Sequence, residues 1–136
     1  MSAAVNTGLE DTMSNNLYER LGGAKGIASL VDDIVEAHLN NSAIKARFLP
    51  IRDDPVRFAG AKQHLRNFLG AGSGGPEQYS GRSMLDAHRG MNISAQEYMA
   101  AIDDILSTMS KHKIDEQTRK DVLAIAYSLK DEIVHV

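Results

Sequence analysis

The sequence predicts an all-α protein. Apolar residues recur at steps of three and four, no segment alternates convincingly between apolar and polar residues, and no hairpin dipeptide separates β-branched runs. With 136 residues, 43% of them hydrophobic, the chain is long enough to bury one core, so we expect a single domain over residues 15–136. Residues 1–14 are polar, with neither a basic start nor an apolar run, and are expected to form a disordered tail, not a signal peptide or membrane anchor.

The composition excludes several kinds of site. The chain has no cysteine, which rules out disulfides, thiolate metal sites, iron–sulfur clusters, thiol nucleophiles and covalent haem attachment through a C-x-x-C-H motif. A net charge of −3 with scattered basic residues argues against nucleic acid as a partner. Aromatic residues make up only 5% of the chain, so aliphatic side chains or a group that is not protein must fill the core. We expect a cytoplasmic protein with no membrane contact.

The first expected helices are separated by glycine and asparagine pairs. A short helix over residues 17–21 follows the capping residues Asn15 and Asn16 and stops at the glycine pair 22–23. The next helix covers residues 24–39, where seven positions at helical spacing form one apolar stripe. The stripe consists of Ile27, Leu30, Val31, Ile34, Val35, His38 and Leu39.

A single turn and a second long helix come next. The turn over residues 43–48 follows a cap at Ser42 and is closed by Pro50. The pair Asp54-Pro55 starts the long helix, because the aspartate can cap it and the missing proline N–H is not needed there, and it runs to about Leu69. We expect its buried face to contain Phe58, Ala61, Leu65 and Phe68, with His64 in or beside that face.

Three further helices follow the glycine-rich loop over residues 70–76. A short helix over residues 82–90 carries Met84 and His88. Ser94 and Glu97 form a capping box that opens the next helix, and the last helix starts near residue 115. The expected inner positions of these last two helices are Tyr98, Ile102, Ile105, Met109, Val122, Ile125, Leu129 and Ile133.

Histidine is the residue type here that both binds metals and titrates near neutral pH. No two of the five histidines lie at i, i+4, and no H-E-x-x-H or Glu-x-x-His pair occurs, so the spacing does not support a zinc or di-iron site. We expect His112 and His135 to be structural, and His38 to pack or cap a helix end, with a pocket position as the lesser alternative.

His64 and His88 differ from the other three as a pair, because they lie within apolar stripes on separate helices, either side of the glycine-rich loop. Each alone is compatible with a satisfied core histidine. Together they could face each other across a flat cofactor, as a haem iron requires. The chain has no G-x-S-x-G motif, no Walker loop and no dinucleotide fingerprint between a strand and a helix, so no catalytic motif competes with this interpretation.

Three motifs resemble those of the truncated haemoglobins, the two-on-two globins, and fit group I best. They are L-Y-E-R-L-G-G at residues 17–23, H-x-x-x-F-L at residues 64–69 and G-G-P-x-x-Y-x-G-R-x-M-x-x-A-H at residues 74–88. The resemblance covers nearly the whole chain from Leu17 onward. It implies a two-on-two helical sandwich around a noncovalent haem b, with His88 as the proximal ligand of the iron.

The resemblance also implies a set of haem contacts. Phe48 matches the phenylalanine that packs on the porphyrin face, and Tyr98 is expected to reach the proximal side. Arg82 and Lys62 are the expected cations for the haem propionates. The expected lining of the proximal side is Met84, Met91 and Ile93, and Ala61, Leu65 and Phe68 are further expected contacts from the distal helix.

The distal side departs from the family pattern. Val35 stands where the family places a tyrosine that hydrogen-bonds bound oxygen, and Ile34 and His38 are its expected neighbours in the distal pocket. Aligned back from the glycine pair 74–75, His64 takes a position where some members carry a histidine that can ligate the iron. Aligned forward, Gln63 becomes the distal polar residue instead. We prefer the first alignment because Phe68 and Leu69 then also match.

The resemblance implies a haem protein that binds O₂, NO or CO reversibly, with nitric oxide detoxification of the dioxygenase type or peroxidase activity as candidate reactions and a reductase as partner. The alternative is a six-coordinate, bis-histidine haem protein for electron transfer or redox and gas sensing. A third hypothesis is a helical interaction domain without a cofactor. The sequence leaves the physiological ligand, the iron coordination, the redox partner and the oligomeric state open.

Overall fold

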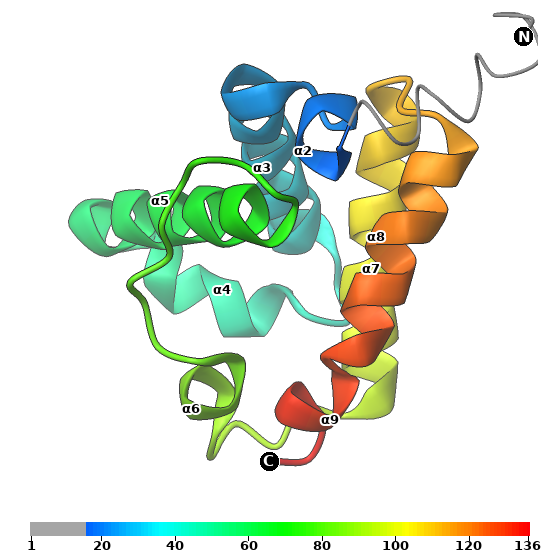
Figure 1. Cartoon of the computed structure of the whole chain (residues 1–136). Coiled ribbons are helices and arrows are strands. Elements are labelled where there is room, and N and C mark those ends of the chain that lie inside the picture. The colour runs from blue at the N-terminus through cyan, green and yellow to red at the C-terminus, as the bar shows by residue number, and fades with distance from the viewer. Residues whose placement is uncertain (1–15) are drawn as a thin grey trace, which may run out of the picture.

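The computed structural model describes residues 16–136, and the tail expected over residues 1–14 lies outside them. Within the described residues the chain forms eight helices and no strand, which confirms the all-α prediction (Figure 1). The helices are α2 (Leu17–Arg20), α3 (Gly23–Asn40), α4 (Lys45–Arg52), α5 (Pro55–Gly72), α6 (Met84–His88), α7 (Ala95–Lys111), α8 (Glu116–Ser128) and α9 (Lys130–Ile133).

The centre of the fold is α3, which packs against α4, α5 and α7. All seven residues of the predicted apolar stripe are buried on this one helix. The turn before it brings two backbones together, because a Cβ on Gly26 would lie 2.4 Å from the carbonyl oxygen of Leu21. Gly22 has a φ of +96°, a left-handed conformation that glycine adopts without steric cost. The glycine pair therefore lets the chain turn sharply from α2 into α3.

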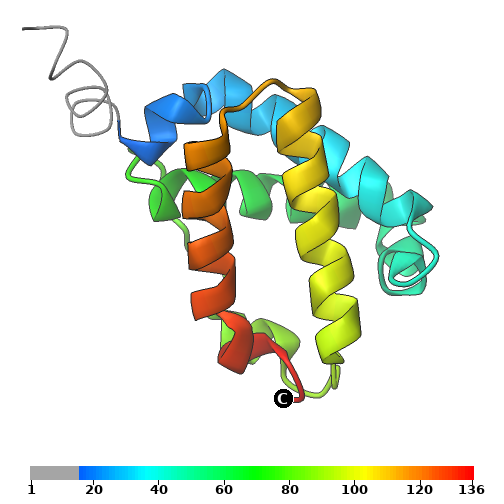
Figure 2. The same cartoon turned by 90° about the vertical axis from the view of Figure 1, so that its right-hand side faces the viewer.

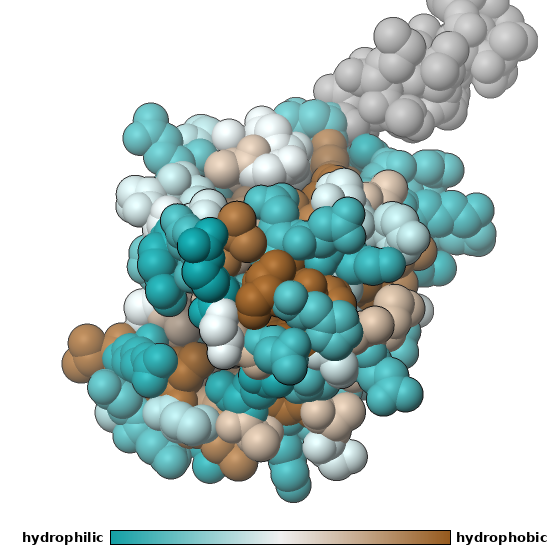
Figure 3. Space-filling view, turned by 90° about the horizontal axis from the view of Figure 1, so that it is seen from below, coloured by the Kyte–Doolittle hydropathy of each residue, from teal (hydrophilic) through white to brown (hydrophobic). Residues whose placement is uncertain are grey.

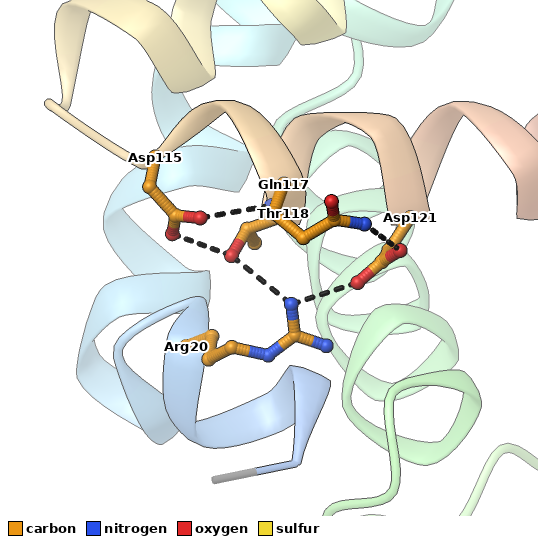
Figure 4. Close-up of polar contacts among 5 residues, drawn as sticks. All are labelled: Arg20, Asp115, Gln117, Thr118 and Asp121. Atoms are coloured by element: carbon orange, nitrogen blue, oxygen red, sulfur yellow. Dashed lines mark hydrogen bonds and ion pairs between the residues drawn. The ribbon is translucent and has the colours of Figure 1, made fainter. Parts of the chain in front are cut away.

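A polar network fastens α2 to α8. Arg20 donates hydrogen bonds to Asp121 at 2.7 Å and to the Thr118 hydroxyl at 3.3 Å (Figure 4). Thr118 is fully buried, and its hydroxyl donates to Asp115, the residue that caps α8. Arg20 holds the pKa of Asp121 below its usual range, mainly through the hydrogen bond. This network fixes α2, the first helix of the described residues, against the start of α8.

Helices α7 and α8 stand side by side, with α6 and α9 near their lower ends in the view of Figure 2. The capping box predicted at Ser94 and Glu97 is present at the start of α7. The C-terminal segment then returns to the loop after α6, where the N–H of His135 donates to the carbonyl of Ile93 at 2.9 Å. The chain end thus holds α6 in place, although α6 is only five residues long.

Four details of the predicted helices were wrong. Pro50 does not close a turn over 43–48 but lies inside α4, because its fixed φ suits a helix and its missing N–H removes only one hydrogen bond. No side chain caps α4, so the expected cap at Ser42 was also wrong. Helix α5 continues past Leu69 to Gly72, and the last predicted helix is interrupted at Leu129, between α8 and α9.

Candidate haem site

His88 is the last residue of α6, and its ring is oriented by the helix itself. Ser83 caps α6 by accepting a hydrogen bond from the N–H of Asp86. One turn later, His88 Nδ1 lies 2.7 Å from the carbonyl oxygen of Met84. A carbonyl only accepts hydrogen bonds, so Nδ1 carries the proton and Nε2 keeps its lone pair. Nε2 has no hydrogen-bond partner among the described residues, which is the arrangement expected of a metal-ligating histidine.

Helix α5 presents two apolar faces, where the sequence predicted one. Phe58, Leu65 and Leu69 pack against the core around α3. His64 and Phe68 lie about a quarter of a turn away, on another side of the helix. The predicted buried position Ala61 is exposed and falls on this second side, as does His64 itself. The expectation of a single buried face was therefore wrong. Helix α5 packs on the core with one row of apolar residues and directs a second row away from the core.

The second face of α5 meets the loop that leads to α6. The ring of Tyr79 contacts the Phe68 ring edge-on, with centroids 5.2 Å apart, and the His64 ring at 6.0 Å. The Tyr79 hydroxyl donates to the carbonyl of Arg82, which orients the ring within its own loop. Tyr79 thus joins the face that carries His64 to the segment that carries His88. Tyr79 belongs to the G-G-P-x-x-Y-x-G-R part of the motif at residues 74–88, and the sequence alone assigned it no role.

Lys62 and Gln63 lie away from the His64 face. Residues two apart on a helix point in nearly opposite directions, and Lys62 Nζ accordingly pairs with Asp32 of α3 at 3.3 Å and lies over the Phe58 ring. Gln63 donates to Asn67 at 3.1 Å and lines a hollow against α3. The structure therefore places Lys62 against Asp32 and Gln63 against Asn67, both away from His64.

The expected distal neighbours on α3 are buried in the core. Ile34 and Val35 are both buried, and the valine offers no hydrogen-bond donor. His38 is only 7% exposed, with Nδ1 2.8 Å from an Asp104 carboxylate oxygen and its ring stacked on Phe48. Of the two roles that the sequence allowed for His38, the structure shows packing.

The residues expected on the proximal side occupy varied surroundings. Met84 is half-buried and Met91 is 38% exposed. Ile93 is buried where the chain end pairs with it, and the Tyr98 hydroxyl donates to the carbonyl of Ala126, which joins α7 to α8. Arg82 is exposed and makes no ion pair among the described residues.

Arg47 of α4 forms an ion pair with Glu97 at the start of α7. The hydrogen bonds from Arg47, together with the capping-box backbone of Ser94, lower the pKa of Glu97 to about 2. A further Arg47 nitrogen donates to the carbonyl of Met91 at 3.1 Å. Arg47 therefore holds α4, and with it Phe48, against both the start of α7 and the loop after α6.

The surface seen from the α6 side gathers hydrophobic residues at its centre, with hydrophilic residues around them (Figure 3). Across residues 16–136, no group of three or more His, Asp or Glu side chains could hold a metal ion. No helix in the same range is long and apolar enough to span a bilayer.

Comparisons with known proteins agree with this geometry. The model of the bacterial-like globin family matches residues 16–135. A group 1 truncated haemoglobin from Tetrahymena pyriformis is 30% identical over 118 residues, 79% of this chain and 93% of that protein. The group 1 truncated haemoglobin GlbN from Synechocystis is 29% identical over 116 residues, 82% of this chain and 90% of that protein.

Solved structures show the same fold. The truncated haemoglobin from Tetrahymena pyriformis in its Fe(III) form superposes with a TM-score of 0.81 at 20% identity, covering 90% of this chain and all of that one. The two-on-two haemoglobin from Synechococcus sp. PCC 7002, solved with covalently attached haem, gives 0.74 at 24% identity, covering 85% and 93%. The family match over nearly the whole chain, the relatives and the shared fold together establish that this chain belongs to the bacterial-like globin family, as a group 1 truncated haemoglobin, a family that binds haem.

Proposed function

We propose that the chain binds one haem b noncovalently, with His88 Nε2 as the ligand of the iron, and that it binds diatomic gases such as O₂, NO and CO reversibly. The observation that carries the proposal is the hydrogen bond from His88 Nδ1 to the Met84 carbonyl. This bond fixes the tautomer, orients the ring and leaves Nε2 with an available lone pair.

The chemistry of the surrounding residues fits a haem. A haem is a flat apolar ring with two carboxylates, and when bound its iron would bind a histidine nitrogen and a gas. Apolar side chains from three helices, Leu65 and Phe68 of α5, Met84 of α6 and Tyr98 of α7, are only half-buried by protein. The exposed Arg82, close to His88 in the chain, is the cation that supports binding of a propionate.

His64 is the polar side chain we propose for the distal side. It lies on the second face of α5 beside Phe68, makes no hydrogen bond among the described residues and touches the Tyr79 ring only edge-on. Val35, in contrast, is an apolar core residue and cannot donate to a ligand. His64 is therefore the group that donates a hydrogen bond to a bound gas.

The few contacts of His64 also favour a second candidate function, in which His64 binds the iron and the iron is six-coordinate. An external ligand must then displace the histidine, and its apparent affinity falls by the fraction of protein in the open state. This form suits electron transfer or redox and gas sensing. Nitric oxide detoxification, peroxidase activity and a reductase partner stay predictions.

The proposal is tested by visible spectra of the purified protein in ferric, ferrous and carbonyl forms. An intense Soret band is expected in the wild type, and His88→Ala is expected to lose haem or to require added imidazole, because no other side chain replaces Nε2. His112→Ala is the matched control, since His112 binds Asp33 at the far end of α7. An unchanged ferrous spectrum in His88→Ala would contradict the proximal assignment.

His64→Leu separates the two candidates. If His64 binds the iron, the ligand-free ferrous spectrum changes from resolved bands to one broad band, and carbon monoxide binds faster in inverse proportion to the open fraction of the wild type. If His64 only donates a hydrogen bond, the ligand-free spectrum stays the same and O₂ release becomes roughly tenfold faster. A variant that changes neither the spectrum nor O₂ release would remove His64 from the site.

A further inference from the structure

A buried polar cluster lies where α3 ends against α4 and α7, and the gas-binding proposal does not use it. His38 is buried, and its Nδ1 lies 2.8 Å from Oδ2 of Asp104 on α7. The amide of Asn41, which ends α3, donates to both oxygens of the same carboxylate at 3.1 Å. Asp104 therefore accepts hydrogen bonds from two residues of the end of α3, and the cluster joins α3 to α7.

The other side of the His38 ring meets Phe48 of α4. The two rings are stacked, with centroids 5.0 Å apart and planes 27° apart. Phe48 is half-buried and also packs against the apolar core. The neighbouring Arg47 is engaged with Glu97, so the first turn of α4 is held against α7, while the Phe48 ring itself is stacked on the imidazole. A stacked pair of this kind is worth more than its buried area alone.

We propose that His38, held by Asp104, is the positioning residue for Phe48, and that it sets how firmly the Phe48 ring packs on the haem. The proposal rests on the proposed function, since it takes Phe48 as a haem contact. It assigns His38 an action on haem retention through Phe48, with no contact to the iron.

The charge state of His38 gives the cluster a dependence on pH. Burial lowers the pKa of the His38 imidazole below its ordinary value of 6.5, although the hydrogen bond and the charge of Asp104 act in the opposite direction. The groups facing the ring are Asp104 from α7, the uncharged Asn41 from α3 and Phe48 from α4, where the adjacent Arg47 is already paired with Glu97. At neutral pH the ring is therefore uncharged, and its Nδ1–H donates to Asp104.

The sign of the pH effect follows from linkage. The unfolded chain takes up the proton near pH 6.5, and the folded chain does so only at lower pH. The contribution of His38 to the free energy of unfolding is therefore fully present above about pH 6.5 and is lost as the pH falls below it. Protonation in acid also places a charged His38 ring against Phe48. The packing of Phe48 on the haem should therefore change over the same pH range.

The first test measures the rate of haem transfer from the full chain to an excess of a haem-scavenging apoprotein at pH 7.5. His38→Gln keeps a donor for Asp104 and removes the stacked ring, so haem loss should become about three- to tenfold faster. His112→Gln is the matched control, because His112 forms the other histidine–aspartate contact among the described residues, with Asp33 at 2.6 Å, and lies at the C-terminal end of α7. A rate in His38→Gln equal to that of His112→Gln would overturn the proposal.

The second test follows the Phe48 ring protons by NMR in the ferrous carbonyl form, which is diamagnetic, as the pH is lowered. The wild type and His112→Gln should show a transition below pH 6.5, and His38→Gln should lack it. Asp104→Asn still accepts the hydrogen bond but lacks the charge that raises the His38 pKa, so its transition should move to lower pH. If His38→Gln does not fold, the transition pH of Asp104→Asn decides the matter. A transition at the same pH as in the wild type would contradict the proposal.

These outcomes are distinguishable from failure of the proposed function. A wild type without a Soret band would contradict haem binding itself. A wild type with a Soret band whose Phe48 resonances do not titrate would leave haem binding intact and remove the role proposed for His38.

Discussion

Helices α3 and α5 are both 18 residues long and pack against each other, yet they are buried very differently. Helix α3 buries seven side chains, and α5 buries only Gly70. The apolar residues of α5 are divided between a line that packs on α3 and a second line, with His64 and Phe68, that meets Tyr79. We infer that α3 is the structural centre of the fold, whereas α5 keeps part of its apolar surface for a group that is not protein.

The strongest test of this contrast replaces one valine on each helix by alanine, and the larger effect is expected for the valine of α3. Val31 of α3 is fully buried, so Val31→Ala removes two methyl groups from a packed core and leaves a cavity. The free energy of unfolding, measured by urea denaturation, should fall by about 2 kcal/mol. A change near zero would mean that α3 is not the structural centre.

Phe68→Ala tests the second face of α5. Its ring contacts Tyr79 and is only half-buried, so its removal should speed haem loss by about tenfold, a change close to 1.4 kcal/mol. The free energy of unfolding without haem should change less than in Val31→Ala. Measuring both quantities on the two variants separates the roles, and a larger loss of haem-free stability in Phe68→Ala would reverse the comparison.

The ion pairs that join the two helices should contribute less. The Asp32 carboxylate of α3 forms ion pairs with two residues of α5, Lys62 at 3.3 Å and Arg66 at 3.2 Å. The Asp32 side chain is half exposed. Asp32→Asn should lower the free energy of unfolding by less than about 1 kcal/mol, because exposed pairs are largely solvated. The difference from wild type should shrink in about 1 M salt, where charges are screened. A salt-independent loss would show that the contact acts through packing.

Val56 of α5 is the control for Val31, because it is 84% exposed. Val56→Ala should change the free energy of unfolding by no more than about 0.5 kcal/mol, since it buries little area and alanine has the higher helix propensity. Thermal unfolding followed by circular dichroism measures it directly. A cost as large as that of Val31→Ala would show that burial does not distinguish the two helices.

The sequence predicted the regular parts of the fold well and the less regular boundaries poorly. The stripe of α3 was predicted residue by residue, because a single packed face repeats every 3.6 residues. The caps Asp54, Ser94 and Asp115 stand where the local pattern placed a helix start. The two faces of α5 were missed, since two overlapping stripes give no single period, and Pro50 was misjudged because a proline can either end a short helix or continue it.

The candidate site also has parts that the sequence predicted and parts that only the structure shows. The motifs and the spacing of His64 and His88 pointed to both histidines and to the family before any contact was known. The Met84 carbonyl that orients His88 is a backbone atom one helical turn away, and only the geometry of α6 reveals that it is used. Lys62 was expected at a propionate, but its direction depends on the rotation of α5 against α3, where it meets Asp32.

The sequence by itself determined where most of the helices lie, the caps Asp54, Ser94 and Asp115, the glycine turn before α3 and the positions of the two candidate ligands, because these depend on neighbours within one or two turns of the chain. Only the tertiary structure decided that His38 meets Asp104, 66 residues away, and that Phe48 covers its ring. Such contacts depend on how separate helices pack and rotate against one another, and no local sequence pattern specifies that arrangement.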